Sequence, residues 1–222
     1  MSKPLLRKQE RPAAGFLLLG LILSAAYLVM CHVYGRTPEM RLCRCIFKGF
    51  INLCWLAAAF IASRRSPDRL NRKILLALVF YSIGDVLAPA NFLVGGAAFA
   101  VGHLVITGGY LRQYGMSRRQ WGVLAAVSAG MIAILTLSLG ADWRLPFFAL
   151  YLIVLVTMDV AAFPCRYYFV TVNVFLLSDV LAYIRKLFFN WDWFHDVTLM
   201  VYYAAILLYC FSFRVLNQEN DE

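Results

Sequence analysis

The residues of this sequence that could do chemistry are ionisable side chains placed inside long apolar runs. There are six of them: His32, Lys48, Asp85, His103, Asp159 and Asp179. An ionisable group inside a bilayer is energetically costly, so each one is a candidate functional residue. Two carboxyl groups in one apolar pocket cannot both ionise cheaply, and one protonated plus one ionised carboxyl is what general acid and general base catalysis requires. Such a pair of carboxyl groups must lie at the same depth in the membrane.

Depth in the membrane separates these residues. At about 1.5 Å of rise per residue, Asp85 lies about 16 Å and Asp179 about 18 Å from the cytoplasmic ends of their predicted helices. His103 lies about 16 Å from the opposite end of its own helix, so the three side chains are predicted to meet near the midplane. No lysine or arginine is expected in this layer. Asp85 and Asp179 are therefore the predicted catalytic pair, and replacing either by Asn is expected to leave the fold intact.

The other ionisable residues have simpler interpretations. Lys48 is predicted about 8 Å from the outer surface, where it could extend to the headgroups, bind a phosphate headgroup or pair with an aspartate. Asp159 lies in the inner half and is expected to pair with Arg166. His32 is expected at the interface, and His103 could serve only as a hydrogen-bond partner of a neighbouring helix.

Hydroxyl-bearing and aromatic residues accompany both aspartates. The run YSIGDV places Ser82 and Tyr81 about one turn before Asp85. The run FLLSDVLAY places Ser178 directly before Asp179. The candidate substrate-binding residues are Lys48, Ser82, His103, Ser178, Tyr202 and Tyr203. The remaining wall would be Leu, Val and Phe, which suits an acyl or alkenyl chain better than a hydrated ion.

The elements that must position these residues are membrane-spanning helices. Of the 222 residues, 62% are hydrophobic and 15% charged, with a mean hydropathy of +0.71; an ordinary soluble domain is about 45–50% apolar and about 25% charged. This composition excludes a water-soluble domain and a disordered chain. Apolar runs fall at 14–34, 43–62, 74–88, 92–111, 121–140, 146–162, 167–188 and 196–214. We expect an all-α, multi-pass integral membrane protein, a bundle of eight transmembrane helices in one domain over 1–222.

Positive charge predicts the orientation of the bundle. With a cytoplasmic N-terminus, fourteen Lys and Arg residues fall on the inner side and six on the outer side. This bias fits the positive-inside rule, so both termini are predicted to be cytoplasmic. The net charge of +9 is thereby assigned to membrane topology. Nucleic acid is not an expected partner, membrane lipids are, and in a bacterium the location would be the cell membrane.

The motifs around the aspartates resemble those of a known family. The segment YSIGDVLAPANFLVGGAAFAVGHL resembles the G-D-V-x-L … F-x-x-G-x-x-x-F-x-x-x-H-L signature of the YhhN-like membrane family. FLLSDVLAYIRKLF resembles its second signature, Tyr202 and Tyr203 its final-helix motif, and Lys48 its lysine in the second helix. The resemblance runs from about residue 44 to 212 in the same order. The LVIT run after His103 and the AAILL run after the tyrosines depart from the pattern.

The resemblance implies a specific hydrolysis. The YhhN-like family includes the lysoplasmalogenases, which cleave the vinyl ether bond of lysoplasmalogens to a fatty aldehyde and glycerophospho-ethanolamine or -choline. Its essential aspartates correspond to Asp85 and Asp179. Vinyl ethers hydrolyse through protonation of the β-carbon and attack of water on the resulting oxocarbenium ion, which a carboxyl pair can perform. No metal and no other cofactor is expected, and the expected partner is a lysophospholipid substrate within the bilayer.

Two other functional classes stay open from the residues alone. A metal-dependent, ceramidase-like lipid amidase would need several histidine ligands, whereas the only three here, His32, His103 and His195, are predicted at different depths. A small transporter or proton-coupled protein also uses midplane carboxylates and glycine-rich helices. Inverted repeats would favour the transporter, and none is evident in the sequence.

Overall fold

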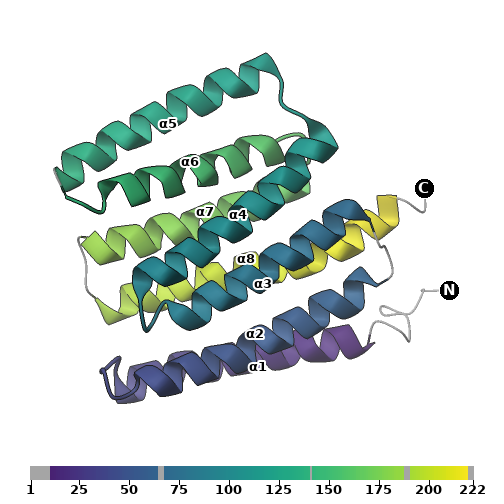
Figure 1. Cartoon of the computed structure of the whole chain (residues 1–222). Helices are drawn as coiled ribbons and strands as arrows, with labels where there is room; N and C mark the ends of the chain where they lie inside the picture. The colour runs from purple at the N-terminus through teal and green to yellow at the C-terminus, as the bar shows by residue number, and fades with distance from the viewer. Residues whose placement is uncertain (1–10, 65–67, 141, 188–190, 220–222) are drawn as a thin grey trace.

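The computed structural model describes residues 11–64, 68–140, 142–187 and 191–219 and is helical throughout, with no strand in these ranges (Figure 1). The helices are α1 (Arg11–Tyr34), α2 (Arg41–Ser63), α3 (Arg69–Leu87), α4 (Phe92–Tyr114), α5 (Arg118–Leu139), α6 (Leu145–Ala162), α7 (Arg166–Leu187) and α8 (Asp192–Glu219). Successive helices run in opposite directions along one bundle (Figure 1). The predicted all-α class is confirmed.

Seven of these described helices are long and apolar enough to cross a membrane. The remaining one is α3, whose 19 residues include Arg69, Arg72, Lys73 and Asp85. In Figure 1, α3 lies alongside α4 and runs the length of the bundle like its neighbours. The chain therefore has the helices of an integral membrane protein, while the total of eight spans stays a prediction.

The start of α3 differs from the predicted span 74–88. The helix begins at Arg69, because the carboxylate of Asp68 accepts hydrogen bonds from the backbone N–H of Arg69 at 2.6 Å and Leu70 at 3.4 Å. Such a cap satisfies donors that a helix start otherwise leaves unpaired. The helix ends at Leu87, so Asp85 lies in its last turn. The predicted midplane position of Asp85 is therefore wrong; it lies near the end of the bundle where α3 turns into α4.

Glycines let α3 and α4 pack closely, as small residues do in membrane helix pairs. A Cβ added to Gly102 would lie 2.5 Å from the ring of Tyr81, and one added to Gly95 would lie 2.8 Å from the backbone of Ala88. These two helices, joined by residues 88–91, therefore form a closely packed hairpin. Its close approach places the Tyr81 ring beside His103 of α4, with ring centroids 5.0 Å apart.

The interior and exterior of the bundle differ in the residues they use. Large aromatic side chains are fully buried between the helices, among them Trp55, Tyr110 and Tyr209. Aliphatic side chains such as Leu18 and Leu137 are exposed at 60% and 87%. An extended exposed apolar surface on a bundle of this kind fits contact with lipid.

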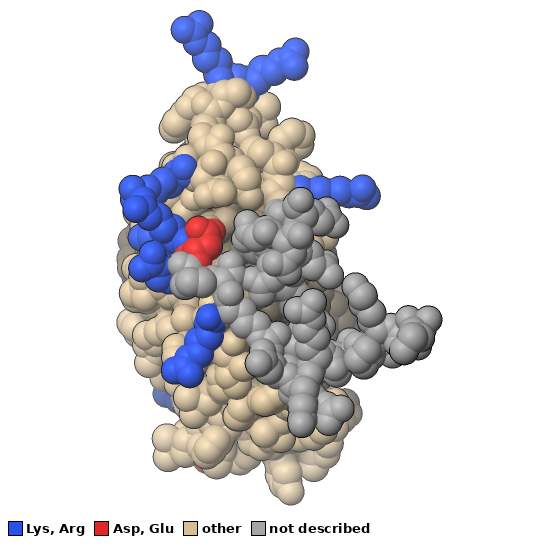
Figure 2. All heavy atoms as spheres, turned by 90° about the vertical axis from the view of Figure 1, so that its right-hand side faces the viewer, with Lys and Arg blue, Asp and Glu red and all other residues tan. Residues whose placement is uncertain are grey.

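Positive charge gathers at one end of the bundle. The start of α1 and the end of α8 lie at the same end of the bundle (Figure 1), and Figure 2 shows Lys and Arg side chains distributed over the described part of that face. The helices that begin there, α1, α3, α5 and α7, each have an arginine as their first residue: Arg11, Arg69, Arg118 and Arg166. This arrangement is the one that the predicted orientation requires, and the orientation itself stays a prediction. We refer to the opposite end as the outer end.

Candidate active site

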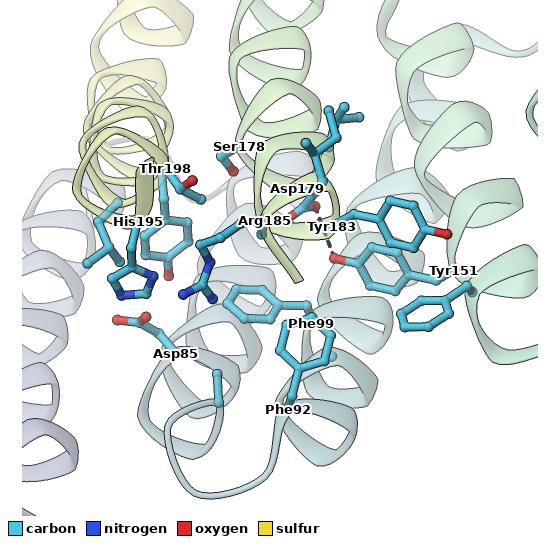
Figure 3. A pocket seen from close by; sticks show the side chains of 18 of the residues that line it. Asp85, Phe92, Phe99, Tyr151, Ser178, Asp179, Tyr183, Arg185, His195 and Thr198 are labelled. Carbon is cyan, nitrogen blue, oxygen red and sulfur yellow. Dashed lines mark hydrogen bonds between the residues drawn. The ribbon is translucent and has the colours of Figure 1, made fainter. Parts of the chain in front are cut away.

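A cavity of about 830 Å³ lies inside the outer half of the bundle, and all eight helices contribute to its wall. Both predicted catalytic residues, Asp85 of α3 and Asp179 of α7, line it (Figure 3). Apolar residues from α4, α5 and α6, including Phe99, Leu135 and Leu155, form much of the remaining wall. The sequence-based expectation that both aspartates share one pocket is therefore met, although they reach it at different heights.

Asp85 is held by a buried polar triad. The Lys48 ammonium donates to Oδ1 of Asp85, and the Asn52 amide donates to Oδ2 at 2.9 Å. Lys48, Asn52 and Asp85 are only 4%, 3% and 3% exposed. A buried carboxylate is tolerated when a cation and further hydrogen bonds compensate its lost hydration. Of the three possibilities for Lys48, the pairing with an aspartate is the one observed.

This triad corrects the expectation that no cation shares the layer of the aspartates. Lys48 is eight residues into α2 from the outer end, and Asp85 is in the last turn of α3 at the same end. The long Lys48 side chain spans the remaining offset, and its bond to Asp85 places the charged groups of both residues in one layer. The depth of Asp85 was underestimated because it was counted from Ile74. The predicted helix left out the polar first turn of α3, which begins at Arg69.

Asp179 lies beside a tyrosine and a histidine that form a hydrogen-bonded chain. The Tyr151 hydroxyl donates to Oδ2 of Asp179 at 3.0 Å (Figure 3), and Nε2 of His103 lies 3.2 Å from that hydroxyl and 3.4 Å from Oδ2. On the other side of the ring, Nδ1 of His103 lies 2.9 Å from the Tyr81 hydroxyl. The Asp179 side chain is 15% exposed, whereas that of His103 is completely buried. Asp179 thus faces the cavity and His103 stands behind it.

The other predicted substrate-binding residues divide into two groups. Tyr202 and Ser178 line the cavity, with the Ser178 hydroxyl donating to the Phe175 carbonyl. Ser82 and Tyr203 lie outside the lining that the described residues form. The Ser82 hydroxyl donates to the carbonyl of Leu78 in its own helix, and Tyr203 packs against the Tyr202 ring. Direct substrate contact is therefore not supported for Ser82 and Tyr203.

Asp159 has a different partner from the one expected. Its Oδ1 accepts a hydrogen bond from the Asn173 amide at 2.8 Å, and among the described residues it forms no ion pair with Arg166. It does not belong to the cavity lining. Within the described part of the chain, no three His, Cys, Asp or Glu side chains come together in a group that could hold a metal ion.

Basic residues that sequence reasoning assigned to topology line the outer end of the cavity. They are Arg36, Arg44 and Arg185, together with His195. Arg36 pairs with Asp192 at 2.8 Å and also with Asp196 of the first turns of α8. Sequence reasoning also did not single out Tyr151 as a functional residue, because a tyrosine within an apolar run resembles an ordinary packing residue. The signal that could have found the arginines is their position at the helix ends next to Lys48 and Asp85.

Comparison with known proteins assigns the chain to a family. The family model described as the YhhN family matches residues 43–213. The chain belongs to the YhhN family. This membership confirms the resemblance inferred from the motifs. Neither a search of curated proteins nor a search of solved structures gives a match.

In this YhhN family protein, the matched region contains both aspartate motifs and the side chains that hold them. The two motifs converge on the cavity from α3 and α7, but each aspartate meets a different environment. Asp85 is bonded to a cation and an amide, which stabilise a negative charge. Asp179 is bonded to a phenol and lies beside an imidazole, and its Oδ1 has no hydrogen-bond partner among the described residues. This difference is what a pair of carboxyls with separate acid and base roles requires.

Proposed function

We propose that this YhhN family protein is an integral membrane hydrolase that cleaves the vinyl ether bond of lysoplasmalogens. The products would be a fatty aldehyde and glycerophospho-ethanolamine or -choline. The observation that carries this proposal is the pair of carboxyls in unlike surroundings on the wall of one largely apolar cavity. An alkenyl chain fits the apolar wall, and acid-catalysed addition of water needs the two carboxyls.

The different surroundings suggest which aspartate does what. Asp179 would be the general acid: Tyr151 donates to Oδ2, which leaves Oδ1 to carry a proton toward the cavity. That proton is transferred to the β-carbon of the vinyl ether, and the electron pair of the double bond forms the new C–H bond. The ether oxygen then shares a lone pair with the α-carbon, giving an oxocarbenium ion. General acid catalysis of this kind contributes about 10²–10⁴-fold to a rate.

Asp85 would act on the cation and on water. Its carboxylate, paired with the Lys48 ammonium, stabilises the oxocarbenium charge electrostatically and accepts a proton from the attacking water. The hemiacetal that results collapses to the aldehyde and the glycerol alcohol: Asp85 gives the proton it took from water to the leaving oxygen, and Asp179 accepts the proton of the hemiacetal hydroxyl. The sum is one water consumed and one C–O bond broken, and both carboxyls return to their starting states.

The test is a panel of lysolipids that differ only in the bond at the first glycerol carbon. Purified protein is incubated with vinyl ether, alkyl ether and ester lysophospholipids, and free aldehyde and free fatty acid are measured. We expect aldehyde from the vinyl ether alone. Fatty acid release from the ester, or no product from any of the three, would overturn the proposal.

A further inference from the structure

The described ion pairs at the outer end of the cavity involve only two of its four cations. The described cations of the lining are Arg36, Arg44, Lys48 and Arg185. Lys48 forms an ion pair with Asp85, and Arg36 forms ion pairs with Asp192 and Asp196. Arg44 and Arg185 form no ion pair with any described carboxylate. Within the described residues, two arginines on the cavity wall thus have no ion-pair partner.

Some hydrogen-bond donors of Arg44 and Arg185 also have no partner among the described residues. Nε of Arg44 and Nε of Arg185 are buried, with no hydrogen-bond partner within the described residues, and Arg44 makes only a long 3.4 Å contact to the Thr37 carbonyl. Nδ1 of His195 is unpartnered in the same way. Figure 3 shows the Arg185 guanidinium and the His195 ring turned into the same part of the cavity that Asp85 faces. Buried donors without partners are costly, so this part of the cavity is suited to an anionic ligand.

The height of these residues gives the position of that ligand. Arg44 is in the first turn of α2, Arg185 is in the last turn of α7 and His195 is in the first turn of α8. All three therefore lie at the outer end of the bundle, at the height expected for lipid headgroups. The cavity continues from there to the apolar residues Met131 and Leu135 of α5. A ligand that fills it would be anionic at one end and apolar at the other.

The spacing of Arg185 and Asp179 matches one class of amphiphile. Six residues separate them on α7, which is about 9 Å along the helix axis. In a lysophospholipid, the phosphate and the bond at the first glycerol carbon are separated by a single glycerol unit and its flanking oxygens, a distance of the same order. Guanidinium groups bind phosphate oxygens through paired hydrogen bonds, which makes arginine well suited to this headgroup.

We propose that Arg44 and Arg185, with His195 beside them, form a phosphate subsite that holds the phosphodiester of a lysophospholipid at the outer end of the cavity. The subsite orients the lipid with its headgroup outward and its first glycerol carbon at the height of Asp179. This inference rests on the proposed function for its choice of ligand.

The test measures binding without turnover. The full-length protein in detergent is titrated with a non-hydrolysable alkyl ether lysophosphatidylethanolamine, and ligand-dependent stabilisation of the thermal midpoint gives the affinity. The same titration uses an alkylglycerol of equal chain length, which lacks phosphate, and inorganic phosphate, which lacks a chain. We expect the lysophospholipid to bind at least about 10-fold more tightly than the alkylglycerol, since bonds to a charged group are the strong ones.

Substitutions test whether Arg44 and Arg185 cause the difference in affinity between the lysophospholipid and the alkylglycerol. In Arg44→Gln and Arg185→Gln, the lysophospholipid should bind at least about 10-fold more weakly, whereas alkylglycerol binding should not change. Arg185→Lys keeps the charge but not the paired donors, so it should lose less affinity for the lysophospholipid than Arg185→Gln. Arg41→Gln is the matched control, because Arg41 is exposed, lies in the same turn as Arg44 and is not part of the cavity lining. An unchanged midpoint without ligand shows that each variant folds.

The outcomes separate this proposal from the proposed function. Equal lysophospholipid affinity in wild type and both Gln variants would overturn the phosphate subsite, even if aldehyde release is observed. Equal binding of inorganic phosphate and lysophospholipid would overturn the assignment of the subsite to a lipid headgroup. Weakened lipid binding in the Gln variants, together with no hydrolysis of any lysolipid, would support the subsite and reject the hydrolase.

Discussion

At the scale of single residues, Asp179 and Asp85 differ in how they should respond to the same substitution. Asp179→Asn removes the proposed acid but keeps an oxygen that can accept the Tyr151 hydrogen bond. Turnover of the vinyl ether should fall by about 10²–10⁴-fold, with a thermal midpoint close to that of the wild type. Asp159→Asn is the matched control, since Asp159 is a half-buried aspartate outside the cavity and the oxygen of an Asn side chain can also accept the Asn173 bond. Near wild-type turnover in Asp179→Asn would contradict the assigned role.

Asp85→Asn should destabilise the protein as well as inactivate it. The substitution leaves the Lys48 ammonium buried without its counter-charge, and removing one partner of a buried ion pair costs about 3–5 kcal/mol. The ion pair thus changes the expectation, drawn from the sequence, that Asn at either position is harmless to the fold. The measurement is the free energy of unfolding in detergent.

A double substitution tests the cause of that loss. Lys48→Met combined with Asp85→Asn removes both charges, so we expect it to recover most of the stability while remaining inactive. If the double variant is as unstable as the sum of the two single variants, the ion pair is not the reason.

At the scale of elements, the helices were predictable but the limits of one of them were not. Continuous apolar runs identify membrane helices well because the bilayer forbids exposed backbone polar groups. The same signal ends where polar residues begin, so it missed the first turn of α3, which Asp68 caps. Depths counted from apolar residues then misplaced Asp85 by several residues and hid its pairing with Lys48. Arginines at helix ends carry two possible meanings, topology or ligand binding, and sequence alone does not separate them.

The contact of α3 with α4 gives a prediction at this scale. Gly102→Ala would place a Cβ 2.5 Å from the ring of Tyr81, which is fully buried and cannot move aside freely. Overpacking of this kind costs about 1–3 kcal/mol, and the displaced Tyr81 hydroxyl should weaken its bond to His103 and lower turnover. Gly108→Ala is the control: nothing lies within 4 Å of its Cβ, and the helix should gain about 0.5–1 kcal/mol. Thermal unfolding and aldehyde release of both variants check this; equal behaviour of the two would contradict the close packing.

At the scale of the whole molecule, the position of the cavity and the distribution of positive charge together predict which side of the membrane the cavity faces. The cavity lining includes Arg44, Arg185 and the Lys48–Asp85 pair, and these residues lie toward the end of the bundle at which α1, α3, α5 and α7 end. That end is opposite to the start of α1 and the end of α8 (Figure 1). The end at which the termini lie has the distribution of Lys and Arg that is typical of a cytoplasmic face (Figure 2). A lysolipid would therefore enter with its headgroup on the outer leaflet side, and this consequence depends on the orientation of the chain.

Natural cysteines make the orientation testable in intact cells. Cys43 is exposed in the first turn of α2, at the outer end. With both termini cytoplasmic, a membrane-impermeant maleimide should label Cys43 from outside the cell, and Cys43→Ser combined with Cys45→Ser should abolish this labelling. A cysteine introduced at the opposite end by Arg118→Cys, in that double Ser background, should react only after the membrane is opened. The reverse pattern would place the cavity mouth, and with it the proposed headgroup subsite, on the cytoplasmic side, because Cys43 lies one residue from Arg44 at the same end of the bundle.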